Sequence, residues 1–225
     1  MLNNKYAFLE ALVIAVFVFS AGIAIGVYFE NNRSGQIQNL YYDYEITVSD
    51  VSASLDILSS SNQSCNQVWT KLLFLNDKVY ETAMKLEKYD NSNKITPELI
   101  VLHKRYDLLR TILWQQFILA KKKCGVERNT VVYLYQYRDP SIETRGIQGA
   151  ISNYLTDLDN KYPDKIVLIP IAADLDLSSL ELMKSFYGID SYPIVIVNEK
   201  YQVQDLNAFD SIETNLDLNN SRTKK

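Results

Sequence analysis

An uninterrupted apolar run near the start of the chain gives way to evenly spaced apolar positions further on. Residues 11–29 read ALVIAVFVFSAGIAIGVYF, without a charged side chain. A helix needs about 20 such residues to cross the hydrocarbon core of a bilayer. Tyr28 and Phe29 suit the membrane interface, where aromatic rings are enriched. The run predicts a membrane-spanning helix that remains as an anchor, with membrane lipid as the partner of residues 11–29.

Two other interpretations of this run stay open. The mostly small residues at positions 20–24 are compatible with a cleaved signal peptide, although positions 25–29 continue the apolar run past such a site. A buried helix of a soluble domain is the second alternative. Positive charge does not specify the orientation of the helix in the membrane. Lys5 precedes the run and Arg33 follows it, so the two flanks carry nearly equal positive charge.

Three stripes of apolar positions follow, each with steps of three and four residues. The first stripe comprises Ile37, Tyr41, Tyr44, Val48, Val51, Leu55 and Leu58. The second comprises Cys65, Val68, Leu72, Leu75, Val79, Thr82 and Leu86. The third comprises Leu99, Leu102, Tyr106, Leu109, Leu113, Phe117 and Ala120. Because this spacing gives a helix one apolar face, the stripes predict three helices that pack through these faces.

Local signals place the ends of these helices. Polar residues at 59–64 and 90–94 separate the stripes. Thr96 is expected to cap the third helix with Pro97 at its first position, and Gly125 is expected to end it. Short breaks favour antiparallel neighbours. We therefore predict a helical hairpin or three-helix stalk satisfied within one chain, while dimerisation or the binding of a partner through the stripes stays open.

The two cysteines fall at the ends of two predicted helices. Cys65 begins the second helix and Cys124 ends the third, so an antiparallel arrangement makes them neighbours. A disulfide between them requires Cα atoms within about 7 Å; two unpaired thiols are the alternative. Because disulfides persist in oxidising compartments, we expect a single-pass protein of the cell membrane, with the N-terminus cytoplasmic and the C-terminal part extracytoplasmic.

After Gly125 the apolar pattern changes to short strands that alternate with helices. The predicted strands are 130–137, 166–172, 192–197 and 201–204. The predicted helices are 142–161, 178–187 and 207–216. Continuous apolar strands separated by helices indicate a sheet covered on both faces. The expected fold class of this part is α/β.

The segment Tyr187-Gly188-Ile189-Asp190-Ser191-Tyr192-Pro193 resembles the Y-G-I-x-x-x-P motif of the thioredoxin family, and the β-rich residues 194–197 follow it directly. The resemblance covers roughly residues 129–217. It implies a thioredoxin-like domain, a cis bond between Tyr192 and Pro193, and a hairpin turn with a fourth strand in residues 198–203.

The chain departs from that family at the catalytic position. The family's C-x-x-C motif follows the first strand, where helix amides depress the pKa of a thiol. The matching stretch here reads Tyr137-Arg138-Asp139-Pro140-Ser141-Ile142 and contains no cysteine. Asp139 is expected to cap the next helix instead. We therefore expect no dithiol oxidoreductase activity by the family's route and no enzyme.

The resemblance also implies a binding groove. In catalytic relatives the loop before the cis-proline offers its backbone to an extended peptide. One side of the corresponding groove would comprise Ser191, Tyr192 and Pro193, and the other Tyr137, Arg138 and Asp139. A protein or peptide partner is expected there. The alternative is that Pro193 is present only because the fold needs it at that turn.

Composition narrows the remaining function classes. A net charge of −4 does not suggest a nucleic-acid partner, which needs a basic face. The chain has one histidine, His103, and two cysteines, too few for a zinc site built from several such ligands or for a dependable catalytic triad. We expect neither a metal nor a cofactor.

These observations predict four segments: an anchor (1–33), a helical stalk (34–126), a thioredoxin-like domain (127–217) and a disordered tail (218–225). The expected function is that of a membrane-anchored, redox-inactive, extracytoplasmic adaptor. Two alternatives stay open. Cys65 and Cys124 could be the redox pair of a thiol–disulfide enzyme, or the protein could be a purely architectural subunit of a membrane complex.

Overall fold

The structure, a computed structural model, describes residues 4–60, 64–90, 97–125 and 128–218. The chain divides into two compact units, Met1–Glu45 and Ile46–Lys225. The first helix, α1 (Asn4–Ser60), contains residues of both units. The predicted loop at 91–94, the predicted cap Thr96 and the tail beyond residue 218 lie outside the described residues.

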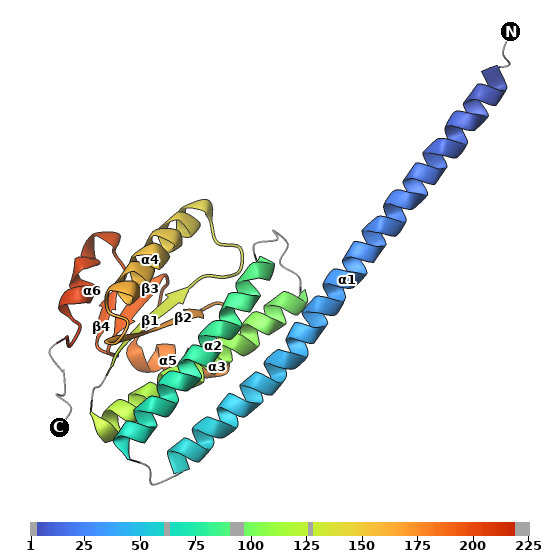
Figure 1. Cartoon of the computed structure of the whole chain (residues 1–225). Helices are drawn as coiled ribbons and strands as arrows, with labels where there is room; N and C mark the ends of the chain where they lie inside the picture. Colours follow the sequence, from blue (N-terminus) through green and yellow to red (C-terminus); the bar gives the residue numbers. More distant parts are fainter. Residues whose placement is uncertain (1–3, 61–63, 91–96, 126–127, 219–225) are drawn as a thin grey trace. The chain divides into compact units, whose positions relative to one another are not determined.

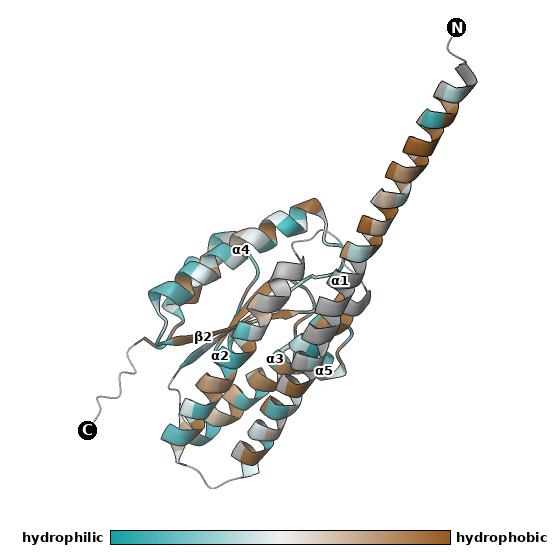
Figure 2. Ribbon diagram, turned by 45° about the vertical axis from the view of Figure 1, so that its right-hand side comes forward, coloured by the Kyte–Doolittle hydropathy of each residue, from teal (hydrophilic) through white to brown (hydrophobic). Residues whose placement is uncertain are grey.

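The apolar run lies in the N-terminal half of α1. Residues Phe8–Phe29 form a segment long and apolar enough to cross a membrane, and their side chains are almost all exposed. Figure 2 shows hydrophobic residues concentrated in this half of the helix. The structure confirms a candidate membrane helix near the N-terminus, and it extends the segment three residues before the predicted Ala11.

The second and third stripes form the contact between α2 (Cys65–Asp90) and α3 (Pro97–Cys124), which lie side by side (Figure 1). From Val68 to Thr82 the described stripe residues of α2 are buried, and so are all those of α3. In the first stripe only the side chain of Val51 is described, and it is fully buried. Its neighbour Asp50 forms a 2.6 Å ion pair with Lys78 of α2.

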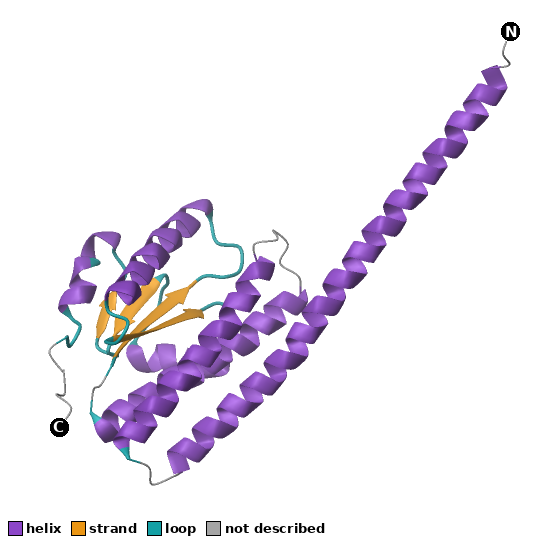
Figure 3. Ribbon diagram, viewed as in Figure 1, coloured by secondary structure: helices purple, strands orange, loops and turns teal. Residues whose placement is uncertain are grey.

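Four strands form one mixed sheet in the order β2-β1-β3-β4 (Figure 3). They are β1 (Asn129–Tyr135), β2 (Ile166–Ala172), β3 (Ile194–Val197) and β4 (Tyr201–Val203). β1 pairs with β2 in parallel, whereas β3 is antiparallel to both β1 and β4. The α/β class is confirmed, although β1 and β3 are shorter than predicted.

Helices cover both faces of this sheet. On one face α4 (Ile142–Lys161) and α6 (Asp210–Thr214) pack over a core of alternating strand residues. On the other face lie α5 (Ser178–Tyr187) and α3 (Figure 1). The helices predicted as a stalk therefore pack directly on the sheet through α3, which contacts β2, β1 and α5.

The last predicted helix, 207–216, is divided in the structure. A 3-10 turn, η1 (Leu206–Ala208), precedes α6. Asp205 accepts a hydrogen bond from the Asn207 amide at 2.9 Å and so begins a separate turn. The Tyr154 hydroxyl then donates to the Phe209 carbonyl at 3.0 Å. The prediction of a single continuous helix was wrong. These side-chain contacts determine where each turn begins, and the spacing of apolar residues does not reveal them.

Candidate functional site

The first-strand loop, residues 136–141, connects β1 to α4. The backbone amides of Tyr137 and Arg138 donate to the two carboxylate oxygens of Asp174, at 2.9 and 2.7 Å. The Arg138 side chain also donates to Asp176 at 3.1 Å. Asp174 and Asp176 follow β2 directly, so the loop is held by the neighbouring parallel strand's C-terminal end.

Ser141, not Asp139, caps α4. The Ser141 hydroxyl accepts a hydrogen bond from the Thr144 amide at 3.0 Å, as expected of an N-cap residue. Asp139 is exposed and has a left-handed backbone, with φ +43°. The predicted cap at Asp139 was wrong because that residue lies too far before the first helical residue, Ile142, to reach the first free amides.

The proline loop, residues 190–193, begins where α5 ends. Gly188 takes the left-handed conformation with φ +61°, and the Ile189 amide donates back to the Lys184 carbonyl at 2.9 Å. The buried Ile189 side chain then fixes the start of the loop. The bond between Tyr192 and Pro193 is cis, as predicted. The loop leads directly into β3.

Lys184 of α5 contacts the end of β2 and the proline loop. Its Nζ atom is 3.5 Å from the carbonyl of Ala173, which follows β2, and 5.5 Å from the ring centre of Tyr192. On the other side of the proline loop, the Gln204 side chain donates to the Ser191 hydroxyl at 3.0 Å. The structure thus joins Tyr137 and Arg138 through Asp174, whereas Ser191 and Tyr192 contact other partners. A groove between the two loops stays a prediction.

A second stripe on α3 lies beneath the first-strand loop and along the sheet. It consists of residues at steps of three, four and seven: His103, Asp107, Arg110, Trp114 and Lys121. All except Lys121 are less than 9% exposed, and the side chain of Lys121 is 9% exposed. The His103 ring packs on the ring of Tyr137, with 4.1 Å between centres. We call these five residues the sheet-facing stripe.

Sequence reasoning missed the sheet-facing stripe, although a signal was present. The same 3–4 spacing that defined the apolar stripe recurs here, at four polar or charged positions and one tryptophan. Polar residues at such positions usually mark a solvent-facing side. A single histidine and a single tryptophan within the stripe were the hint that this side of α3 is not a solvated surface.

Asp107 is the most enclosed charged residue of this stripe, with no exposed surface. Burial raises the pKa of its carboxyl group to about 7, while Arg110 and His103 pull the pKa in the opposite direction. Within the described residues neither carboxylate oxygen has a hydrogen-bond partner at standard geometry, although the Ala172 amide is close enough to lower the pKa. We regard Ala172 as a weak donor to this group.

Arg110 connects the stripe to the edge of the sheet. Its guanidinium lies 3.9 Å from the ring centre of Tyr106 and donates to the carbonyl of Pro170 on β2. β2 is an edge strand, and Pro170 removes one backbone donor from it. Arg110 and Pro170 together reduce the capacity of this edge to pair with another chain.

At the other end of α3, Lys121 binds the hairpin turn between β3 and β4, residues 198–200. Its Nζ atom lies 2.9 Å from Glu199, 3.1 Å from Asn198 and 2.6 Å from Thr130. Burial lowers the pKa of Lys121, and the Glu199 carboxylate opposes that change. Glu199 also accepts a hydrogen bond from the Trp114 indole at 3.1 Å.

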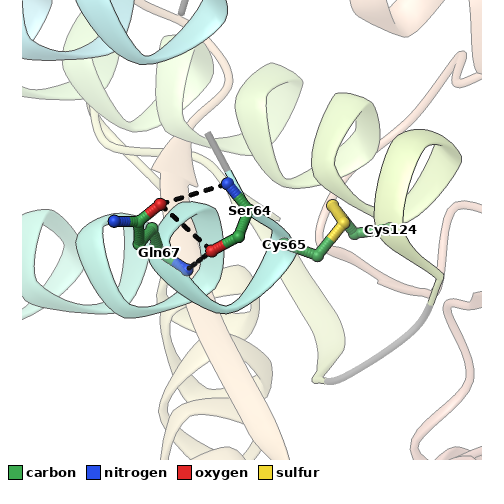
Figure 4. Close-up of a disulfide and its surroundings, with 4 residues drawn as sticks. All are labelled: Ser64, Cys65, Gln67 and Cys124. Atoms are coloured by element: carbon green, nitrogen blue, oxygen red, sulfur yellow. Dashed lines mark hydrogen bonds between the residues drawn. A yellow bond between two sulfur atoms is a disulfide. The ribbon is translucent and has the colours of Figure 1, made fainter. Parts of the chain in front are cut away.

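The predicted disulfide is present and joins the start of α2 to the end of α3 (Figure 4). The Cα atoms of Cys65 and Cys124 are 5.4 Å apart. Ser64 and Gln67 form a capping box before it: the Ser64 amide donates to Gln67 at 3.1 Å, and the Gln67 amide donates to the Ser64 hydroxyl at 3.5 Å. This cap sets the first turn of α2 and hence the direction of Cys65.

The chemistry of the site follows from these positions. Both cysteines of the chain belong to one disulfide between α2 and α3. The two loops offer backbone groups, tyrosine rings and the Arg138 guanidinium, which can bind but cannot exchange disulfides.

Comparisons of the chain with protein-family models, with curated proteins and with solved structures found no match.

Proposed function

We propose that the chain is a membrane-anchored, redox-inactive thioredoxin-like protein that acts as an extracytoplasmic binding module. The observation that carries this proposal is the sheet order β2-β1-β3-β4, with β3 antiparallel to both neighbours and preceded by the proline loop. This arrangement, with helices on both faces, supports the resemblance to the thioredoxin family. The first-strand loop then occupies the position at which that family carries its dithiol.

The residues of the first-strand loop support a redox-inactive protein. Asp139, Pro140 and Ser141 occupy the turn into α4. A hydroxyl or carboxylate oxygen can accept helix amide bonds but cannot attack a disulfide. A purified full chain in detergent should not accelerate the reduction of a small disulfide substrate by an excess of a dithiol, which proceeds slowly without protein. Turnover above that of the Cys65→Ser/Cys124→Ser variant would contradict this part of the proposal.

The surface around the loops supports binding of a polypeptide. Ile142 at the start of α4 is 91% exposed, and Tyr137 and Tyr192 are each partly exposed. Aromatic rings with one polar end and an exposed apolar side chain are typical of protein-binding surfaces. The backbone before β3 would pair with an extended segment of the partner, in the manner of strand addition.

Two features support the proposed location. The segment Phe8–Phe29 has the length and composition of a membrane span, and a disulfide favours an oxidising compartment. We would treat intact cells with a membrane-impermeant maleimide, with and without prior reduction. Labelling of Cys65 and Cys124 only after reduction is expected. Free thiols that appear only after lysis would place this part of the chain in the cytoplasm.

A site-specific photo-crosslinker tests the binding surface. Placed at Ile142 or at Tyr192 of the full chain in cells, it should capture the same discrete polypeptide. Asn153 is the matched control, because it is exposed and lies three turns further along the same face of α4 as Ile142. Capture of that polypeptide with equal yield at Asn153, or different products at Ile142 and Tyr192, would contradict a groove between the loops.

The alternative of a thiol–disulfide enzyme rests on one observation. Cys65 and Cys124 are both partly exposed, and Lys122 and Lys123 lie beside Cys124. Positive charge favours a thiolate, although the C-terminal end of a helix opposes it. The reduction potential of the pair distinguishes a structural disulfide from a redox-active one. The potential of a structural disulfide should lie below about −300 mV, whereas a higher potential would favour the enzyme.

A further inference from the structure

The buried acid and imidazole of the sheet-facing stripe lie directly behind the first-strand loop. His103 and Asp107 are one helical turn apart on α3, and both are buried. His103 packs on the Tyr137 ring at 4.1 Å. The backbone amides of Tyr137 and Arg138 are held by Asp174. The loop is therefore held by two groups, the ring of His103 and the carboxylate of Asp174.

Asp107 interacts electrostatically with both supports. From α3 itself, the charges of Arg110 and His103 stabilise the carboxylate of Asp107. From the end of β2, the Ala172 amide stabilises it and the Asp174 carboxylate repels it. Tyr106, the preceding residue of α3, packs under Arg110 and interacts with Tyr80 of α2. Asp174 is thus an acidic group that opposes ionisation of Asp107 from the end of β2.

We propose that the buried Asp107, one helical turn from the His103 ring that packs on Tyr137, senses protons beneath the first-strand loop and makes partner binding at the two loops stronger at acidic than at alkaline pH. This inference rests on the proposed function, because it concerns the same surface. Its structural part is the pH dependence of the hydrogen bonds between Asp174 and the first-strand loop, which can be measured in the absence of any partner.

The direction follows from the charges. A protonated Asp107 is neutral, so the Asp174 carboxylate is free to accept from the amides of Tyr137 and Arg138. Ionised Asp107 adds a second negative charge in a poorly screened interior, where like charges repel strongly. The repulsion displaces the Asp174 carboxylate from the amides of Tyr137 and Arg138. This loosens the contacts that hold the first-strand loop, so the loop opens more often as pH rises.

Amide hydrogen exchange of the full chain in lipid nanodiscs tests this structural part. Exchange of the peptide that contains residues 136–141 is followed by mass spectrometry at pH 6, 7 and 8 and corrected for the intrinsic pH dependence of exchange. Protection of the loop should fall about fivefold from pH 6 to pH 8, the effect of a modest charge repulsion. The Asp107→Asn variant should keep the protection seen at pH 6 throughout.

Two further variants keep the result unambiguous. Asp157→Asn, an equivalent change at an exposed position of α4, should behave as the wild type. Asp174→Asn removes the repelled carboxylate and should lower protection equally at all three pH values. Wild-type protection that does not change between pH 6 and pH 8, or a pH profile that persists in Asp107→Asn, would overturn the proposal. If hydrogen exchange shows the expected pH dependence but the crosslinkers at Ile142 and Tyr192 capture no polypeptide, only the proposed function is contradicted.

Discussion

Lys121 of α3 and Glu199 of the hairpin turn form a nearly enclosed ion pair, 2.9 Å long, with side chains only 9% and 12% exposed. The pair joins the C-terminal half of α3 to the turn between β3 and β4. Glu199 has a left-handed backbone, with φ +57°, which is unusual for a side chain of this kind. Hydrogen bonds from Trp114 and Thr130 hold the same carboxylate.

Removal of one partner of this pair should destabilise the protein strongly. Lys121→Met and Glu199→Gln each leave a buried charge without its counter-charge, which costs about 3–5 kcal/mol. The double variant should lose clearly less than the sum of the two, because no isolated charge remains. Urea unfolding followed by tryptophan fluorescence measures this, since both tryptophans, Trp69 and Trp114, are buried. Additive losses would show that the two charges act independently.

The disulfide should contribute to stability through the unfolded chain. Cys65 and Cys124 are 59 residues apart in sequence, and closure of such a loop lowers the entropy of the unfolded state. The chain-entropy model gives about 4 kcal/mol. Cys65→Ser/Cys124→Ser should lower the urea midpoint accordingly. A reductant should lower the midpoint of the wild type by a similar amount and leave that of the variant unchanged; a shift in the variant would indicate another cause.

Ionisation of Asp107 should make stability depend on pH. The pKa of this group is about 7 in the folded protein and near 3.8 without burial, so between these values only the folded chain retains the proton. The free energy of unfolding should therefore fall as pH rises from about 4 to about 7, by at most about 1.4 kcal/mol per pH unit. Asp107→Asn should remove this part of the dependence. If the free energy of unfolding of the wild type and of Asp107→Asn changed equally with pH, Asp107 would not be the cause of this dependence.

The capping box before Cys65 should stabilise α2. Ser64→Ala removes the hydroxyl that accepts from the Gln67 amide, and loss of such a cap costs about 1 kcal/mol. Ser64→Asp should recover most of this, because a carboxylate also accepts the amide and suits a helix N-terminus. Thr70→Ala, at an exposed position of α2, is the control and should have little effect. An equal loss in the control would argue against a role for the cap.

Local patterns predicted most element boundaries well. The bounds of β2, α4 and α5 agree with those predicted from residues 166–172, 142–161 and 178–187. These boundaries could be predicted because the apolar periodicity and the capping residues that mark each of them lie within a few residues of it. Asp139 shows the limit, since only the structure shows that the hydroxyl of Ser141, directly before Ile142, accepts the first free helix amide.

The site was predicted only in part. The proline loop, the cis bond at Pro193 and the disulfide pair were anticipated from sequence. The role of Asp174 was not, because it binds a loop that is distant along the chain. The contacts of Lys184 with Ala173 and Tyr192 were not anticipated either, because they depend on how α5 packs against β2 and the proline loop. The sheet-facing stripe was also missed: His103 and Asp107 have the spacing of a helix face, but spacing alone does not distinguish a solvated polar face from a buried one.

The amino-acid sequence by itself therefore determined the elements of this protein: an apolar helix, two amphipathic helices joined by a disulfide, and alternating strands and helices. Each follows from periodicity, caps and turns within a short window. Only the tertiary structure decided that α3 packs between α2 and the sheet and that Asp107, Arg110 and Lys121 are buried there. A charged side chain is buried only where compensating groups surround it. Here the amide of Ala172, the carbonyl of Pro170 and the carboxylate of Glu199 compensate Asp107, Arg110 and Lys121, and all three are far from α3 in the sequence.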